Sequence, residues 1–139
     1  GLVGDNWAQR GSSRTDDGSA HPDMQLNVIN ARLATYVAVD PERRALAGDQ
    51  LHLDLDLSVA NLPPGTQLAL GTAVIEVTEI PHTGCAKFVE RFGRDAMRFV
   101  NSPQGRELRL RGLNAKVVVA GVVRPGDEVR KVPQAAAHR

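Results

Sequence analysis

The clearest periodic pattern in this sequence lies at residues 51–59, where apolar and polar side chains alternate strictly. The apolar positions are Leu51, Leu53, Leu55, Leu57 and Val59. Side chains of a β-strand point alternately to its two faces, so this period of two predicts a strand with one buried face. The polar face carries His52, Asp54 and Asp56. These residue types can ligate Zn²⁺ or Mn²⁺, but same-face positions are roughly 6.5–7 Å apart, which favours a solvated face over a metal site.

Other parts of the chain predict further short strands. Runs rich in aliphatic and β-branched residues, bounded by glycine or proline, lie at 25–29, 68–70, 73–80, 115–123 and 128–132. Such runs favour strands joined by tight turns. The sequence therefore predicts a mainly-β domain.

Short helices are predicted between these strands. Asn30 is a candidate N-cap for a helix over 31–38, and the pair Asp40-Pro41 starts a second helix that ends by Gly48. Two more helices are expected at 86–92 and 94–100, with Gly93 between them.

The only cysteine, Cys85, lies just before the helix expected at 86–92. The N–H groups of a helix N-terminus, together with the nearby Lys87 and Arg91, would lower the pKa of its thiol. The alternative is a small core residue, because Cys85, Phe88 and Phe92 fall on one apolar stripe of the helix. The spacing leaves both interpretations open. His82 is a candidate base for the thiol, but three residues across a glycine fix no geometry, and a structural histidine is the other interpretation.

Composition narrows the class of protein. A chain of 139 residues is long enough for one core, and its formal net charge of +1 gives no reason to expect nucleic acid or an anionic membrane as a partner. One cysteine excludes an internal disulfide and suits a reducing, cytoplasmic compartment. No apolar run approaches the ~20 residues that span a bilayer, so no membrane association is expected.

Several dispersed motifs resemble those of the MOSC family, which is related to the C-terminal domain of molybdenum-cofactor sulfurases. The central signature is Gly84-Cys85-Ala86-Lys87-Phe88, Arg91-Phe92-Gly93, Asp95-Ala96, Arg98-Phe99-Val100-Asn101-Ser102, Gly105 and Leu108-Arg109-Leu110-Arg111-Gly112. The early motif Gly1-Leu2-Val3-Gly4-Asp5 and the closing run 121–129 also resemble the family's. The likeness covers most of residues 1–132.

The resemblance implies a distorted MOSC-type β-barrel with two to four short helical inserts. It implies one domain over 1–132, followed by a flexible tail at 133–139. The family reaches its early motif only after further strands, so we expect a short member or a chain without its first strand or two.

The resemblance also implies a function for Cys85. In the family the matching cysteine carries sulfur as a persulfide or ligates the molybdenum of the molybdenum cofactor (molybdopterin). Chemistry makes Lys87, Arg91, Arg109, Arg111 and His82 candidate cofactor-binding residues. The expected partners are the cofactor or a molybdoenzyme and a cysteine-desulfurase-type sulfur donor, since a pyridoxal-phosphate desulfurase domain cannot fit in 139 residues.

Two alternatives remain. The first is a molybdenum-dependent oxidoreductase that reduces N-hydroxylated compounds with electrons from a partner. The second is a non-catalytic binding barrel in which Cys85 is buried in the core.

Overall fold

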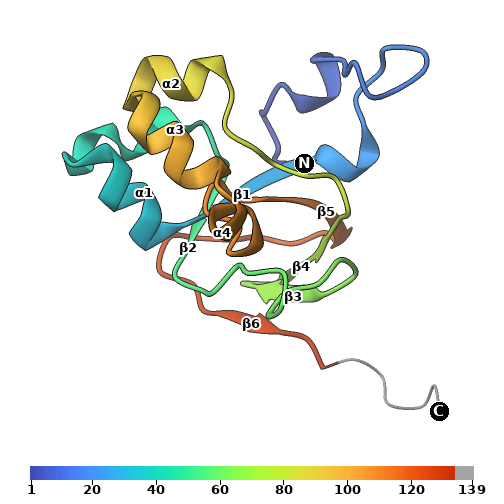
Figure 1. Ribbon diagram of the computed structural model, residues 1–139. Coiled ribbons are helices and arrows are strands. Elements are labelled where there is room, and N and C mark those ends of the chain that lie inside the picture. Colours follow the sequence, from blue (N-terminus) through green and yellow to red (C-terminus); the bar gives the residue numbers. More distant parts are fainter. Residues whose placement is uncertain (134–139) are drawn as a thin grey trace.

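A six-stranded sheet is the framework of the fold. The computed structural model describes residues 1–133, and its strands pair in the order β2-β1-β5-β4-β3-β6 to form one curled, open sheet (Figure 1). The strands are β1 (Leu26–Asn30), β2 (Leu51–Leu53), β3 (Gln67–Leu70), β4 (Ala73–Val77), β5 (Leu113–Val119) and β6 (Val129–Lys131). Neighbouring strands are antiparallel except β1 and β2. The predicted distorted barrel with short helical inserts is confirmed, whereas the tail expected at 133–139 lies outside the described residues apart from Pro133.

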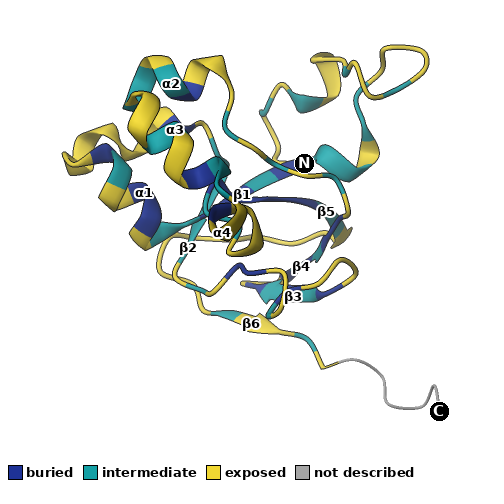
Figure 2. Cartoon of the chain, viewed as in Figure 1, coloured by how far each residue is buried: buried dark blue, intermediate teal, exposed yellow. Residues whose placement is uncertain are grey.

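The main core is built on this sheet. Its buried members come from the strands and from the loop after β2: Leu26, Val28, Leu57, Leu62, Leu68, Leu70, Ile75, Val77, Leu113 and Ala115. Figure 2 shows the buried positions concentrated along the strands, while most loops are exposed. Aliphatic side chains therefore form the core.

The helices α1, α2 and α3 lie together on one side of the sheet, where α1 packs next to β1 and β2 (Figure 1). The α-helices are α1 (Ala31–Ala38), α2 (Ala86–Phe92), α3 (Arg94–Asn101) and α4 (Pro103–Glu107), and 3₁₀ segments are η1 (Trp7–Gln9), η2 (Pro22–Met24) and η3 (Pro41–Ala47). The predicted caps are confirmed. The side chain of Asn30 accepts hydrogen bonds from the backbone N–H groups of Arg32 and Leu33, and Asp40 caps η3, which ends at Gly48.

The helices have a small core of their own. Leu33, Phe88 and Val100 are buried, and they pack with partly buried neighbours that include Phe92 and Met97. This second core attaches α2 and α3 to α1.

The strand predicted at 51–59 is shorter than expected. Only Leu51–Leu53 forms a ladder, because β1 offers just three partners to β2. Beyond Leu53 the chain turns, and the Asp56 carboxylate accepts a hydrogen bond from the Ser58 N–H at 2.9 Å. Asp54 and Asp56 are exposed and Leu57 is 1% exposed, as the alternation predicts. The prediction is wrong after the turn, where Ser58 is buried and Val59 is exposed.

The strand predicted at 115–123 is shifted. β5 begins at Leu113, because residues 113–115 pair with β1. It ends at Val119, after which the Val122 carbonyl accepts from the Thr72 N–H at 3.1 Å at the turn between β3 and β4.

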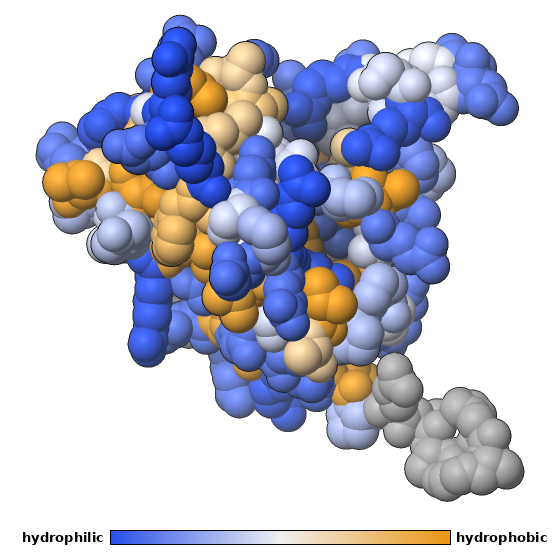
Figure 3. All heavy atoms as spheres, viewed as in Figure 1, coloured by the Kyte–Doolittle hydropathy of each residue, from blue (hydrophilic) through white to orange (hydrophobic). Residues whose placement is uncertain are grey.

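The surface is largely polar. Figure 3 shows hydrophilic residues over most of the visible face, with apolar residues gathered in smaller areas between them. None of the helices within residues 1–133 is long and apolar enough to cross a membrane.

Candidate functional site

Cys85 is the N-cap residue of α2, and it is exposed. Its backbone is extended (φ −126°, ψ −177°), so the side chain leaves the apolar stripe that the sequence pattern indicated. Phe88, three residues on, takes the buried position at 4% exposure. The interpretation of Cys85 as a core residue is therefore wrong, and so is the buried cysteine of the binding-barrel alternative.

The surroundings of Cys85 lower the pKa of its thiol below the ordinary value. The backbone N–H of Phe88 is the largest cause, the N–H of Lys87 and the charges of Arg111 and Lys87 act in the same direction, and partial burial opposes them. The sulfur makes no cap hydrogen bond of normal geometry, so the N–H groups act as nearby dipoles. A lower pKa raises the share of thiolate, which is the form that attacks sulfur and binds metals.

Gly84 is packed directly against α3. A Cβ at this position would lie 2.5 Å from the Met97 sulfur. The Asn101 side chain also holds the Gly84 backbone at both polar atoms: the Gly84 N–H donates to Asn101 Oδ1 at 2.9 Å, and Asn101 Nδ2 donates to the Gly84 carbonyl at 3.2 Å. Close approach to α3 is what requires glycine here.

His82 is held by a carboxylate that the sequence analysis did not single out. Its Nε2 lies 2.9 Å from Asp49 Oδ1, and the Asp49 side chain is 0% exposed. Because the carboxylate can only accept, Nε2 carries the proton in this contact. This contact fixes the imidazole of His82 on the buried carboxylate of Asp49.

Asp49 also pairs with Arg111. Arg111 Nη1 donates to Asp49 Oδ2 at 2.7 Å, Nη2 donates to the Ala47 carbonyl at 2.9 Å, and the guanidinium carbon lies 5.3 Å from the centre of the Phe88 ring. The Arg111 side chain is only 9% exposed. Its Nε has no hydrogen-bond partner among the described residues, so one buried donor remains unused.

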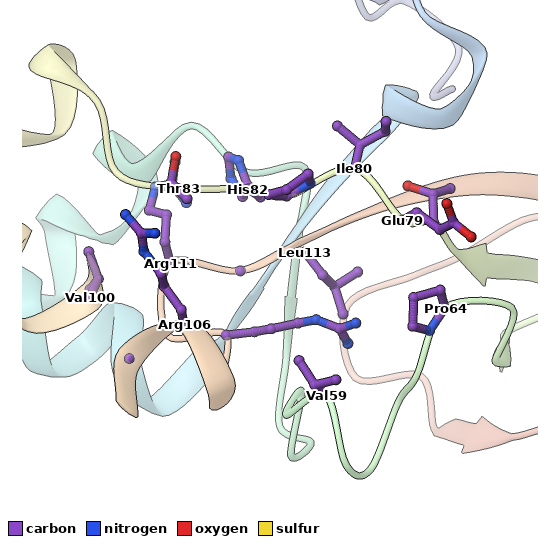
Figure 4. Close-up of a pocket in the computed structure, with 15 residues that line it drawn as sticks. Val59, Pro64, Glu79, Ile80, His82, Thr83, Val100, Arg106, Arg111 and Leu113 are labelled. Carbon is purple, nitrogen blue, oxygen red and sulfur yellow. The ribbon is translucent and has the colours of Figure 1, made fainter. Parts of the chain in front are cut away.

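A cleft of about 400 Å³ opens beside this network. One wall is the segment 78–83, including His82 and Thr83, and another carries Arg106, Arg109 and Arg111 (Figure 4). The rest of the lining is mostly apolar, as at Val59, Pro64 and Leu113. Cys85 does not line the cleft, but Arg111 links the two places, because it lines the cleft and its charge acts on the thiol.

The other predicted cations lie in different places. Lys87 is exposed next to Cys85. Arg91 does not line the cleft, and its Nη1 donates to the Leu46 carbonyl at 2.9 Å. Arg109 lines the cleft, yet its Nη1 donates to the carbonyls of Leu57 and Leu62, and burial lowers the pKa of its guanidinium. The structure thus brings His82, Arg109 and Arg111 to one cleft, and it leaves Lys87 and Arg91 outside it.

The polar face of the predicted strand at 51–59 forms no metal site. Asp54 is exposed and pairs with Arg32 at 3.0 Å. Within residues 1–133, no three His, Cys, Asp or Glu side chains are grouped so that they could hold a metal ion.

Three residues that organise the site were missed by sequence reasoning: Asp49, Asn101 and Asn114. Asn114 is 0% exposed, and its Nδ2 donates to the carbonyls of Ile80 and Pro81 at 3.0 and 3.3 Å. Asn101 lay within the resembling signature, so it could have been singled out there. Asp49 and Asn114 stand in ordinary turn and strand contexts, and no local pattern marks them.

Comparisons with known proteins concern the fold. No family model and no curated protein matches the chain. The chain is similar to the crystal structure of YiiM from Geobacillus stearothermophilus, with 18% identity and a TM-score of 0.61 over 84% of this chain and 58% of that one. It is also similar to YiiM from Escherichia coli, with 21% identity and a TM-score of 0.57 over 86% of this chain and 59% of that one.

A third solved structure, described as a hypothetical protein, has 23% identity and a TM-score of 0.56 over 84% of this chain and 55% of that one. The chain thus spans less than two thirds of the length of each of these structures. YiiM is a known MOSC-domain protein, so the likeness supports the MOSC-type fold. At these identities the likeness concerns the fold alone.

Proposed function

We propose that this chain is a MOSC-type domain of molybdenum-cofactor chemistry, in which Cys85 carries sulfur as a persulfide or ligates molybdenum. The observation that carries the proposal is the state of Cys85. It is an exposed thiol at a helix N-cap, and its pKa is lowered. The backbone of the preceding residue, Gly84, is held by the side chain of Asn101. A sulfur carrier and a metal ligand both need a thiolate that a partner can reach.

The residues around the cleft fit an anionic pterin cofactor. Cys85 offers a soft sulfur. Arg111 supplies a cation to the lining of the cleft, and its buried Nε has no partner among the described residues. Arg106 is exposed at the same cleft and adds a second cation. The bound cofactor would supply molybdenum redox or sulfur-transfer chemistry.

The chain's own residues would bind and orient such a cofactor. Arg111 and Arg106 would hold its anionic end, and Asp49 would keep Arg111 in place. Lys87 lies outside the cleft, and its positive charge would stabilise the thiolate form of Cys85. Arg91 and Arg109 are engaged with backbone carbonyls, so the proposal gives them a supporting role.

The proposal requires partners. Sulfur on Cys85 would come from a cysteine-desulfurase-type enzyme with its own pyridoxal phosphate, and it would pass to the cofactor or to a molybdoenzyme. The cytoplasm is the proposed compartment, because a reducing environment keeps the lone cysteine as a free thiol.

The test is to express the protein in a host that makes molybdenum cofactor and to compare wild type with Cys85→Ala. Native mass spectrometry and elemental analysis would detect an added sulfur atom or molybdenum. The expected result is stoichiometric sulfur or molybdenum on wild type and neither on the variant. Arg111→Ala is unsuitable as a second variant, because it would leave Asp49 buried without its partner. Arg106→Ala is the appropriate one, with molybdenum retention expected to fall.

Whether sulfur or molybdenum is found on the protein distinguishes a sulfur carrier from a molybdenum-binding domain. Sulfur on Cys85 would favour the carrier. Molybdenum would favour the metal-ligand role, and turnover of an N-hydroxylated compound with an added electron donor would then identify an oxidoreductase. Equal loading of wild type and Cys85→Ala, or no loading of either, would contradict the proposal.

A further inference from the structure

The segment that leads into Cys85 is irregular, and polar side chains from three different parts of the chain hold it: Asn114 and the Asp49 side chain are buried, and Asn101 is half-buried. Asn114 from β5 holds the carbonyls of Ile80 and Pro81. Asp49 holds His82. Asn101, the last residue of α3, holds Gly84, which is the residue directly before the thiol.

Asn101 makes the most specific of these contacts. Its amide oxygen and nitrogen bind the N–H and the carbonyl of the same glycine, so Gly84 can neither rotate nor slide along α3 without losing a hydrogen bond. Its Nδ2 also lies 3.3 Å from the Met97 sulfur, one turn earlier on α3. That sulfur occupies the space where a Cβ of Gly84 would stand.

The position of Gly84 decides the position of Cys85. The N-cap residue has extended backbone angles, and the first turn of α2 starts from it. With Gly84 fixed on α3, the chain enters α2 from one direction only. Without this contact, residues 83–85 would lose their only hydrogen bonds to α3, and the first turn of α2 would fray.

We infer that Asn101 is a positioning residue for Cys85, acting through the backbone of Gly84. The inference deepens the proposed function, since it assigns a residue to the same thiol. It rests on contacts in the protein itself, so it can be tested without sulfur or molybdenum.

The experiment measures the rate at which Cys85 reacts with iodoacetamide in the folded protein at one fixed pH, together with hydrogen exchange of the Gly84 amide. Asn101→Ala is compared with Ser102→Ala. The control removes the N-cap contact of α4, in which Ser102 Oγ accepts from the Gly105 N–H, and leaves Gly84 untouched. We expect Asn101→Ala to slow alkylation about tenfold and to remove the protection of the Gly84 amide. Ser102→Ala should change neither.

A double-mutant cycle separates positioning from a general loss of structure. Gly84→Ala should push the same segment off α3, so its effect on the alkylation rate and that of Asn101→Ala should not add in the double variant. Wild-type alkylation in Asn101→Ala, equal slowing in Ser102→Ala, or additive effects in the cycle would overturn the inference. Failure of wild type to take up sulfur or molybdenum would count against the proposed function and leave this result unaffected.

Discussion

Two irregular segments of this protein differ in what holds them. Residues 11–19 form an exposed loop whose hydrogen bonds are local: the Thr15 hydroxyl donates to the Ser19 carbonyl at 2.6 Å, and the Ser19 N–H donates to Asp17 at 3.0 Å. Residues 79–85 are equally irregular, yet their partners lie 17 to 34 positions away in the sequence. Loop backbone becomes a fixed part of a site when buried polar groups from the scaffold satisfy it.

The largest expected effect comes from removing the buried carboxylate at the base of the second segment. Asp49→Ala leaves the guanidinium of Arg111 buried without its charge partner and frees His82, so we expect a loss of about 3–5 kcal/mol in the free energy of unfolding. Denaturant unfolding followed by circular dichroism would measure it. Asp49→Asn keeps the shape and serves if the alanine variant does not fold.

Asp54→Ala is the matched control for this prediction. Asp54 also pairs with an arginine, but both side chains are largely exposed, at 68% for Asp54 and 82% for Arg32. Asp54→Ala should lower the free energy of unfolding by less than about 0.5 kcal/mol. Equal losses in the two variants would contradict the view that the buried pair holds the site.

Asn114→Ala should have the next largest effect. It removes the donor to Ile80 and Pro81 and the oxygen that accepts from Asn27 Nδ2 at 2.7 Å. Buried polar groups left without partners should lower the free energy of unfolding by about 2–3 kcal/mol. Hydrogen exchange in residues 79–85 should rise more than elsewhere in the same variant. Uniform exchange across the protein would show that the segment is not held separately by Asn114.

A smaller pair of effects compares a helix cap with the exposed loop. Asn30→Ala removes the cap of α1 and the hydrogen bond from Asn30 Nδ2 to the Leu55 carbonyl, so we expect a loss of about 1 kcal/mol. Ser12→Ala removes only a bond to the Arg14 N–H in the loop and should stay within about 0.5 kcal/mol. Thermal unfolding of the two variants side by side would measure the difference, and a larger loss for Ser12→Ala would reverse the comparison.

Local features of the fold could be predicted from the sequence. Asn30, the pair Asp40-Pro41 and Gly48 marked helix ends correctly, because capping depends on residues within one turn. The alternation at 51–59 correctly indicated that Leu57 is buried, but it was wrong at Ser58, which is buried, and at Val59, which is exposed. It also could not show where the ladder ends. The ladder ends where β1 ends, and β1 is separated from β2 in the sequence by α1 and η3.

The candidate site was only partly predictable. Cys85 stood out because its neighbours in the sequence favour a reactive thiol, but its spacing equally suited a core residue, and the conformation of the N-cap decided between them. Asp49 meets His82 and Arg111 at separations of 33 and 62 residues. Arg91 looked available, yet it is engaged by a carbonyl of η3. Such long-range contacts leave no periodic pattern in the chain.

The central claim is that the fold makes Cys85 a reachable and activated thiol. The most direct measurement is the pH dependence of Cys85 alkylation, in the folded protein and in denaturant. Because folding lowers the pKa of this thiol, the folded rate should reach half its maximum at a lower pH than the unfolded rate. By linkage, the folded state should gain stability as pH rises from the folded to the unfolded pKa, and lose it as pH falls back. A folded midpoint equal to or above the unfolded one, or a thiol that reacts only after unfolding, would contradict the account.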